Sequence, residues 1–160
     1  MNTECKTESI QFHALGSREV RGQFDGGDIT TDAGGLLLRE TEKRTGILKQ
    51  FAGCFQDHRD PRFVEHGIEQ LVSQRVYGLC LGYEDLNDHD QLRSDPMLAV
   101  LVGETDPKGR TRKQARDRGK ALAGKSTLNR LELSTDDAAN HPYKKIGRDE
   151  EAIDEMMVDV

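Results

Sequence analysis

The sequence predicts an α+β fold that is mainly helical, with short antiparallel strands near the N-terminus followed by a helical region. Three observations support this class. Two short strand-forming segments, residues 12–15 and 19–24, are separated by Gly16 and Ser17. Apolar residues then recur at helical spacing through residues 60–81. Further on, short apolar segments follow Asp or Ser residues that can begin helices.

Size and composition limit the core that this chain can build. It has 160 residues, of which 34% are hydrophobic, 5% aromatic and 32% charged, and it contains no Trp. This is the length of one domain, or of one domain with a tail. We expect residues 1–9 to be disordered, residues 10–103 to form an N-terminal α+β region, and residues 104–125 to be a basic linker or arm.

The sequence shows no signal for export or membrane insertion. The first ten residues, MNTECKTESI, contain no apolar run, and no stretch approaches the roughly 18 apolar residues of a membrane span. Cys5, Cys54 and Cys80 are odd in number and widely spaced, which predicts reduced thiols. We therefore expect a cytoplasmic protein without a membrane partner, associated with the nucleoid if it binds DNA.

The N-terminal strands are predicted from composition and turn residues. Residues 12–15 and 19–24 should pair, and the Asp-Gly-Gly turn at residues 25–27 follows them. Residues 28–30 are expected to return as a third strand.

The first helix is predicted to begin after Thr31 and Asp32, which offer an N-cap, and to reach about Thr45. Gly34 and Gly35 lie in its first turn, where glycine is about 1 kcal/mol less favourable than Ala. We expect close packing of this turn on a neighbour to explain them.

Residues 60–81 form the strongest predicted helix. Asp60 is a suitable N-cap and Pro61 suits the first helical position. The side opposite the apolar face is predicted to hold Glu65, Glu69, Gln70 and Gln74. His66 lies on the same polar side and is expected to be solvated. Most of the core is therefore expected to rest on this helix.

Shorter helices follow. Asn87 or Asp88 is predicted to cap one that ends at Leu92, and Asp95, followed by a proline, to begin another over residues 97–102.

The C-terminal part is predicted to hold two more helices. Ser126 is expected to cap a short one that contains Leu128, Leu131 and Leu133. Residues 149–160 place Ile153, Met156, Met157 and Val160 on one helical face. This apolar stripe has little to cover it, so the chain looks cut at this point.

Charge is distributed unevenly along the chain. The net charge is −6, but residues 106–125 hold eight Lys or Arg against two Asp, which makes this window +6. The stretch is rich in glycine and has no apolar period, which predicts a loop or disordered arm. A basic stripe in an acidic chain is typical of a local phosphate-binding site, and a solvated arm without function is the equal alternative.

One motif suggests nucleotide binding. The residues from Gly119 to Ser126, GKALAGKS, match the phosphate-binding loop, in which Lys125 would contact the terminal phosphate and Ser126 would contact magnesium. Such a loop follows a buried strand, whereas residues 112–118 are highly charged. A helix start within a basic linker is therefore favoured.

Metal and catalytic sites are not predicted. Residues 84–90, EDLNDHD, lack the glycine and closing glutamate of a calcium loop, and helix capping uses the same residue types. The histidines His58, His66 and His89 have no zinc-type spacing. The carboxylates Asp25, Asp28 and Asp32 fit turns and caps. We expect no catalytic residue and no metal ligand in this chain.

Three segments occur in an order that resembles a known family. They are FDGGDITTDAGGLLLRE at residues 24–40, EDLNDHDQLRSDP at residues 84–96 and STLNRLE at residues 126–132. They are similar to the N-terminal third of insertion-sequence transposases of the DDE superfamily, in the group called the IS-thirteen-eighty family. The resemblance covers approximately residues 20–160.

The resemblance implies a cut-and-paste transposase that binds the terminal inverted repeats of its element. In this family Asp, Asp and Glu hold Mg²⁺ on a ribonuclease-H-like fold. The first of these carboxylates normally follows a hydrophobic strand just after a helix like residues 149–160. We therefore expect residues 126–160 to be the start of a truncated transposase core, with the catalytic domain missing and no cofactor in this fragment.

The resemblance also implies partners. We expect DNA of the transposon ends, and either the rest of a split transposase or a second copy of the chain. The residues predicted to touch DNA are Arg110, Arg112, Lys113, Arg116, Arg118, Lys125 and Arg130. The alternatives are a stand-alone interaction module, a nucleotide binder that uses residues 119–126, or a relic that never folds stably.

Overall fold

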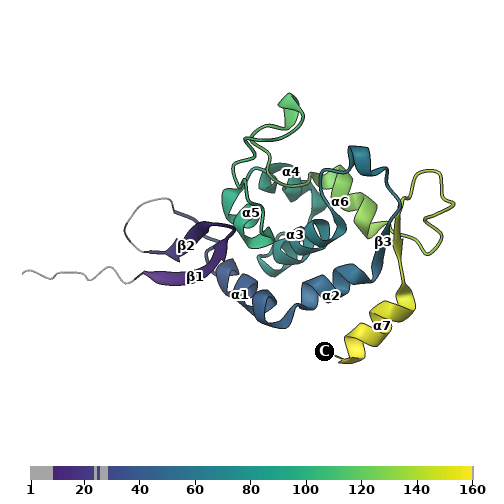
Figure 1. Cartoon of the computed structure of the whole chain (residues 1–160), viewed down its shortest axis with the longest axis horizontal. Coiled ribbons are helices and arrows are strands. Elements are labelled where there is room, and N and C mark those ends of the chain that lie inside the picture. Colours follow the sequence, from purple (N-terminus) through teal and green to yellow (C-terminus); the bar gives the residue numbers. More distant parts are fainter. Residues whose placement is uncertain (1–8, 24, 26–28, 160) are drawn as a thin grey trace, which may run out of the picture.

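A central helix organises the fold. The computed structural model describes residues 9–23, 25 and 29–159, and in it helix α3, Ile68–Cys80, lies in the middle of the other helices (Figure 1). Within these residues there are seven α-helices and two small antiparallel sheets, which confirms the mainly helical α+β prediction. The predicted disordered segment, apart from its last residue, lies outside the described residues, as do Cys5 and the centre of the predicted Asp-Gly-Gly turn.

The N-terminal hairpin is present. Strands β1, Ile10–Leu15, and β2, Arg18–Gly22, pair antiparallel around a turn in which Gly16 has a φ of 59°. The third strand is wrong where it can be judged, because Ile29 and Thr30 are not in a strand, while Asp28 lies outside the described residues.

Helix α1, Gly35–Thr45, is confirmed, but its predicted cap is not. Its N-cap is Gly34, with no side-chain cap, and the Asp32 carboxylate accepts a hydrogen bond from the Tyr83 hydroxyl at 2.9 Å instead. A Cβ added at Gly35 would lie 2.4 Å from Leu101 Cδ1, so close packing explains this glycine as expected. It does not explain Gly34, where a Cβ would meet nothing within 4 Å.

The helix predicted over residues 60–81 is two elements. A short 3₁₀ turn, η1 (Pro61–Phe63), is followed by an extended break and then by α3. The Asp60 cap is confirmed, since its carboxylate accepts a hydrogen bond from Arg62 N at 3.0 Å. Gly67 is extended, with φ of −72° and ψ of 168°, which ends any continuous helix through this point.

The polar side predicted for this helix is partly buried, which corrects the sequence analysis. Gln74 is 0% exposed and His66 is 7% exposed. The Gln74 amide bonds to the backbone of Ala123, accepting from its N–H at 3.0 Å and donating to its carbonyl at 2.8 Å. Helices α2 (Ile47–Gly53), α5 (Pro96–Val102) and α6 (Lys125–Glu132) surround α3, so it has little solvent face.

Two hydrophobic clusters meet on α3, as expected for the main core helix. The first contains Leu36, Tyr77, Leu92, Leu98, Ala99, Leu101, Ala121 and Leu122. The second contains Ala52, Leu71, Val72, Ala123, Leu128, Leu131 and Ile146. Because residues 121–123 contribute to both clusters, the end of the basic stretch is part of the core.

The predicted cap residues of the short helices are confirmed only in part. Asp95 begins α5 as expected, accepting from the backbone N–H groups of Met97 and Leu98. The predicted Asp88 is the N-cap of α4 (His89–Leu92) in position but makes no side-chain hydrogen bond, while the carboxylate of Asp85 caps the preceding turn η2 (Leu86–Asp88). Helix α6 begins after Gly124, and its N-cap makes no side-chain hydrogen bond, so Ser126 is not the cap.

A small second sheet was not predicted. Strand β3, Phe55–Asp57, pairs antiparallel with β4, Ile146–Arg148. Each strand has only three residues, too few to show an alternating pattern. The last helix, α7 (Glu150–Asp159), is confirmed, and its Met157 is 64% exposed, while Val160 lies outside the described residues.

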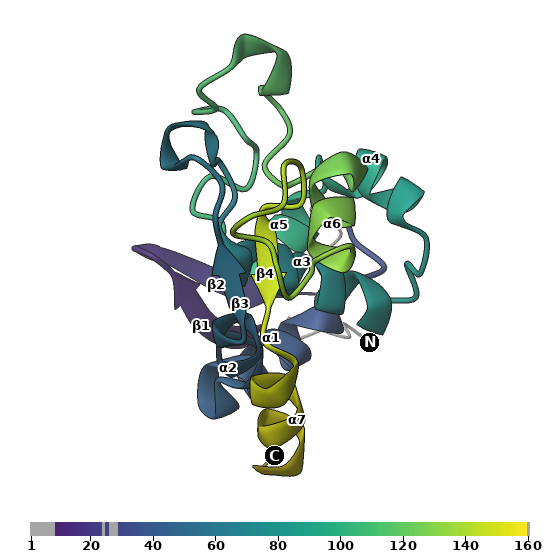
Figure 2. The ribbon, with the colours of Figure 1, turned by 90° about the vertical axis from the view of Figure 1, so that its right-hand side faces the viewer.

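The features that frame the candidate site lie at one end of the molecule. In Figure 2 the loop between α5 and α6 and the turn η1 project from the top, while α7 lies at the bottom.

Cys54 and Cys80 are free thiols, as predicted for these two residues. No described helix is long and apolar enough to span a membrane.

Candidate nucleic-acid interface

The basic stretch forms a loop between α5 and α6, as predicted, with one short 3₁₀ turn, η3 (Ala115–Asp117). Its two arms meet where Gly119 N donates to Gly109 O at 3.0 Å. Gly109 has a φ of 58°, and a Cβ there would lie 2.8 Å from Lys120 N, so the close crossing requires glycine. The Asp106 carboxylate accepts hydrogen bonds from the Thr111 N–H and hydroxyl at 2.7 and 2.8 Å. These bonds give the loop a defined shape.

Arg112 fastens this loop to the segment before α3. Its guanidinium pairs with Glu65 at 2.6 Å and reaches His66 Nε2 at 3.0 Å. His66 Nδ1 lies 2.9 Å from Gln70 Oε1, and Gln70 Nε2 donates to Glu104 at 2.9 Å. This chain of donors assigns the proton of His66 to Nδ1 and leaves Nε2 as an acceptor for Arg112.

His66 is neutral in this arrangement. Burial lowers the pKa of His66, because the charged imidazolium would lose its hydration, and the Arg112 charge acts in the same direction. The hydrogen bond to Gln70 and the carboxylates of Glu65 and Glu104 oppose the shift without reversing it. The loop is thus held by a partly buried polar cluster whose hydrogen bonds require a neutral histidine.

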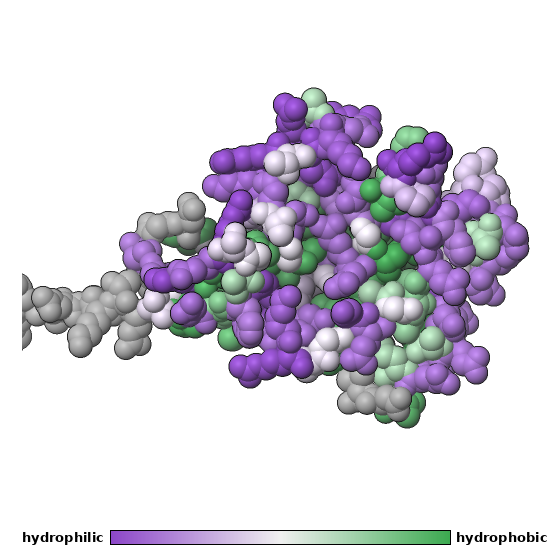
Figure 3. All heavy atoms as spheres, viewed as in Figure 1, coloured by the Kyte–Doolittle hydropathy of each residue, from purple (hydrophilic) through white to green (hydrophobic). Residues whose placement is uncertain are grey.

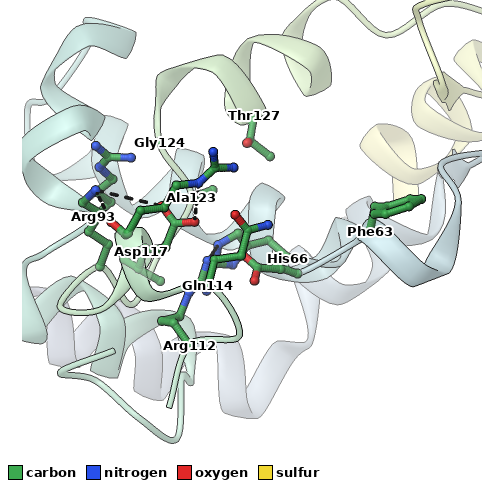
Figure 4. Close-up of a pocket in the computed structure, with 13 residues that line it drawn as sticks. Phe63, His66, Arg93, Arg112, Gln114, Asp117, Ala123, Gly124 and Thr127 are labelled. Atoms are coloured by element: carbon green, nitrogen blue, oxygen red, sulfur yellow. Dashed lines mark hydrogen bonds and ion pairs between the residues drawn. The ribbon is translucent and has the colours of Figure 1, made fainter. Parts of the chain in front are cut away.

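A cavity of about 240 Å³ opens beside this cluster, between the loop, the segment around η1 and the start of α6 (Figure 4). Its cations are Arg93, Arg112, Arg116 and Lys120, against the carboxylates Glu65 and Asp117. Figure 4 shows Arg93 and Asp117 at one end and Phe63 at the other, with His66 and Gln114 between them in this view.

A second cavity, of about 250 Å³, lies on the other side of Phe63. It is lined by Arg59, Asp60, Phe63, Val64, Arg130, Tyr143, Lys145 and Ile146. Phe63 borders both cavities, so they adjoin. We call the two together the basic groove, because their lining holds seven cationic side chains and three carboxylates.

The structure divides the seven predicted DNA-contacting residues. Three of them line the basic groove: Arg112, Arg116 and Arg130. Three others are exposed on the loop: Arg110, Lys113 and Arg118. Lys125 lies elsewhere, since its ammonium contacts Asp90 at 3.4 Å and Asn87 at 3.0 Å. Their contact with DNA stays a prediction.

The exposed cations are available to a ligand. Within the described residues, Lys113, Arg118 and Arg130 make no ion pair closer than 4.0 Å. Arg116 lies 3.6 Å from Asp117, but its side chain is 78% exposed. Hydrophilic residues also cover most of the face seen in Figure 3.

Sequence reasoning missed half of the groove. Arg59, Arg93 and Lys145 come from three separate segments that no local pattern links, while Lys120 lies in the basic stretch but was not among the predicted DNA contacts. Phe63 was expected inside a continuous helix, yet it is 79% exposed on the isolated turn η1. The Asp-Pro pair at residues 60–61 marked the start of that turn, and Gly67 was the local signal that the helix is interrupted.

The nucleotide-binding alternative is not favoured by the structure. Residues 121–123 are at most 2% exposed, so the centre of the motif is buried. The backbone N–H groups of Leu122, Ala123 and Lys125 already donate to Arg93 O, Gln74 Oε1 and Asp90 Oδ1. A phosphate-binding loop needs such N–H groups free to face the phosphate. Here they join the loop to α3 and α4.

The acidic segment at residues 84–90 serves local structure. Asp85 accepts from Asn87 N at 2.8 Å, and Asp90 pairs with Lys125. His89 is 0% exposed and contacts Gln74 at 3.2 Å through Nδ1. In the part of the chain that the structure describes, no group of three His, Cys, Asp or Glu side chains is arranged to hold a metal ion.

Comparison with known proteins identifies the family. Comparisons with curated proteins and with solved structures give no significant match. A family model described as transposase DDE domain group 1 matches residues 12–159, which is nearly the whole chain. The three segments that resemble DDE transposases all lie within this match. The chain therefore belongs to the transposase DDE domain group 1 family.

Proposed function

We propose that this chain binds DNA through the basic groove and the exposed cations of the α5–α6 loop, as the part of a transposase that holds transposon ends. One observation carries the proposal: a protein with a net charge of −6 gathers seven cations around two adjoining cavities. Charge of this kind attracts phosphates locally even when the whole molecule is acidic. The family match supports DNA as the polyanion.

The groove suits the phosphate backbone of DNA better than it suits a small ligand. Its cations are spread over both cavities, and Arg110, Lys113 and Arg118 extend the positive surface along the loop. Each phosphate neutralised releases condensed counterions, so the affinity should fall steeply with salt, with a log–log slope of about −0.9 per phosphate on duplex DNA.

The test is fluorescence anisotropy with a labelled DNA duplex at several salt concentrations. We expect replacement of Arg110, Lys113, Arg116 and Arg118 by Ala to lower the affinity and to flatten the salt slope by about three to four units. The matched control replaces the exposed cations Lys43, Arg44 and Lys49, on α1 and α2. Equal losses in both variants would show non-specific attraction and would contradict the proposed interface.

We further propose that strand cleavage requires catalytic carboxylates that these 160 residues do not supply, on a ribonuclease-H-like domain of the IS-thirteen-eighty type that uses Mg²⁺. Support comes from the acidic side chains of the groove, which are already engaged. Glu65 pairs with Arg112, Asp117 lies near Arg116 and Lys120, and Asp60 pairs with Arg62. Nicking of a plasmid carrying the terminal repeats by this chain and Mg²⁺ would overturn this proposal.

A further inference from the structure

Two aromatic side chains at the basic groove are almost fully exposed. Phe63 is 79% exposed and Tyr143 is 86% exposed, in a chain that has only five Phe and three Tyr. Both line the second cavity, and Phe63 also lines the first. Phe63 belongs to neither hydrophobic cluster, so burial in the core does not explain it, and cationic side chains line both of its cavities.

The turn that carries Phe63 is braced. Phe63 N donates to Asp60 O at 3.0 Å, and Asp60 also pairs with Arg62. Arg62 lies over the Phe63 ring, 5.7 Å from its centroid. Before the turn, Arg59 pairs with Asp57 at 2.6 Å and donates to His66 O at 2.9 Å. These contacts therefore hold the backbone that carries the Phe63 ring in one conformation.

Tyr143 is presented in a similar way from another part of the chain. It lies in the loop between α6 and β4, where the backbone N–H groups of Tyr143 and Lys144 donate to His141 Nδ1 at 3.2 and 2.9 Å. The neighbouring Lys145 and Ile146 line the same cavity, and Ile146 is 1% exposed in the core. The cavity thus has a ring from each of two segments and three cations, Arg59, Arg130 and Lys145.

We propose that Phe63 and Tyr143 form a stacking platform for unpaired bases, so that the basic groove takes a DNA end with single-stranded nucleotides. The inference rests on the proposed DNA binding and deepens it. Every base has a π-face that stacks on an aromatic ring, and cations beside such rings track the phosphates of single strands. In a closed duplex the base faces are stacked on one another, so the rings cannot reach them.

The absence of Trp makes the test direct. A Phe63→Trp variant carries one Trp fluorophore, in the groove. The matched control is Val158→Trp, at a site 85% exposed on α7, at the far end of the molecule from η1 (Figure 2). Each variant is titrated with a twelve-nucleotide oligo-dT and with a duplex hairpin whose two strands are joined by a linker that carries no bases. We expect saturable quenching by the single strand in Phe63→Trp, little quenching by the hairpin, and none in Val158→Trp.

Affinity measurements complete the test. We expect Phe63→Ala and Tyr143→Ala each to weaken oligo-dT binding about tenfold or more, with little change for the hairpin duplex. Thermal unfolding checks that both variants fold, as their exposure predicts. Equal weakening for both DNA forms, or unquenched fluorescence while oligo-dT binds, would overturn the platform but leave DNA binding in place. Failure of every DNA form to bind at low salt would overturn both proposals.

Discussion

Residues 121–123 and the loop residues 108–118 belong to the same glycine-rich stretch, yet they differ in burial. Ala121, Leu122 and Ala123 are at most 2% exposed, and two of their backbone N–H groups bond to other elements. Lys113 and Arg118, a few residues earlier, are exposed. The difference separates two parts of the loop: its base, residues 121–123, belongs to the core, and its tip, residues 108–118, carries exposed charge.

The largest effect is expected from Gln74, which holds the base of the loop. Gln74→Ala leaves the buried N–H and carbonyl of Ala123 without partners. Two such groups, at about 1–3 kcal/mol each, predict a loss of about 3 kcal/mol or more in the free energy of unfolding. Urea unfolding followed by circular dichroism measures it, with the exposed Gln114→Ala as control. Equal midpoints for the two variants would contradict a structural role for the base.

A smaller effect is expected at Arg112, which holds the loop against the segment before α3. Arg112→Ala removes the bonds to Glu65 and His66 and should cost about 1.5 kcal/mol, the lower end for a charge-assisted hydrogen bond. Hydrogen exchange of the loop amides should speed up, since the anchor is lost. The neighbouring, exposed Arg110→Ala should change neither quantity. Unchanged exchange in the Arg112 variant would show that the crossing at Gly109 alone shapes the loop.

Acid should weaken the same fastening. Burial lowers the pKa of His66 and of His89, so the folded protein binds fewer protons than the unfolded chain just below pH 6.5. The contribution of these two histidines to the free energy of unfolding should therefore be complete above pH 6.5 and decrease as the pH drops toward 5. Asp57, whose pKa is held down mainly by the Arg59 guanidinium against the effect of burial, contributes only nearer pH 4. His66→Gln should flatten the slope between pH 7 and 5, and an unchanged slope would exclude His66 as a source.

The smallest effect is expected at the tip itself. Arg118→Ala should leave the melting temperature unchanged, because the side chain is exposed and makes no ion pair within the described residues. If Arg118 contacts a phosphate, the salt slope for duplex DNA should fall by about one unit. Lys49→Ala, on α2, is the control. A fall in the melting temperature would show that Arg118 contributes to folding stability, as the buried base of the loop does, and would contradict its assignment to the exposed tip.

Signals confined to a few neighbouring residues were predicted well. The Asp-Pro pairs at residues 60–61 and 95–96 both begin helical turns, because an N-cap carboxylate and the N–H groups it accepts from lie two or three residues apart. The hairpin, α1 and α7 were also located from residues that lie close together in the sequence. Asp32 failed as a cap because Tyr83, 51 residues away, takes its carboxylate.

Signals that depend on distant neighbours were not predictable. His66 and Gln74 were assigned to a solvated face, because helical periodicity shows which face is apolar but not what covers the other. The groove is a similar case, since the basic stretch supplies only part of its cations, and the others and the two exposed rings come from segments that no spacing rule connects.

The sequence by itself determined the helices with strong local caps, the loop-forming character of the basic stretch and the family segments. Only the tertiary structure decided which polar groups are buried and which cations face a groove. The physical reason is the range of the deciding contacts. Gln74 and Ala123 are 49 residues apart, and Arg112 and Glu65 are 47 apart, whereas caps and periodicity act within about four residues.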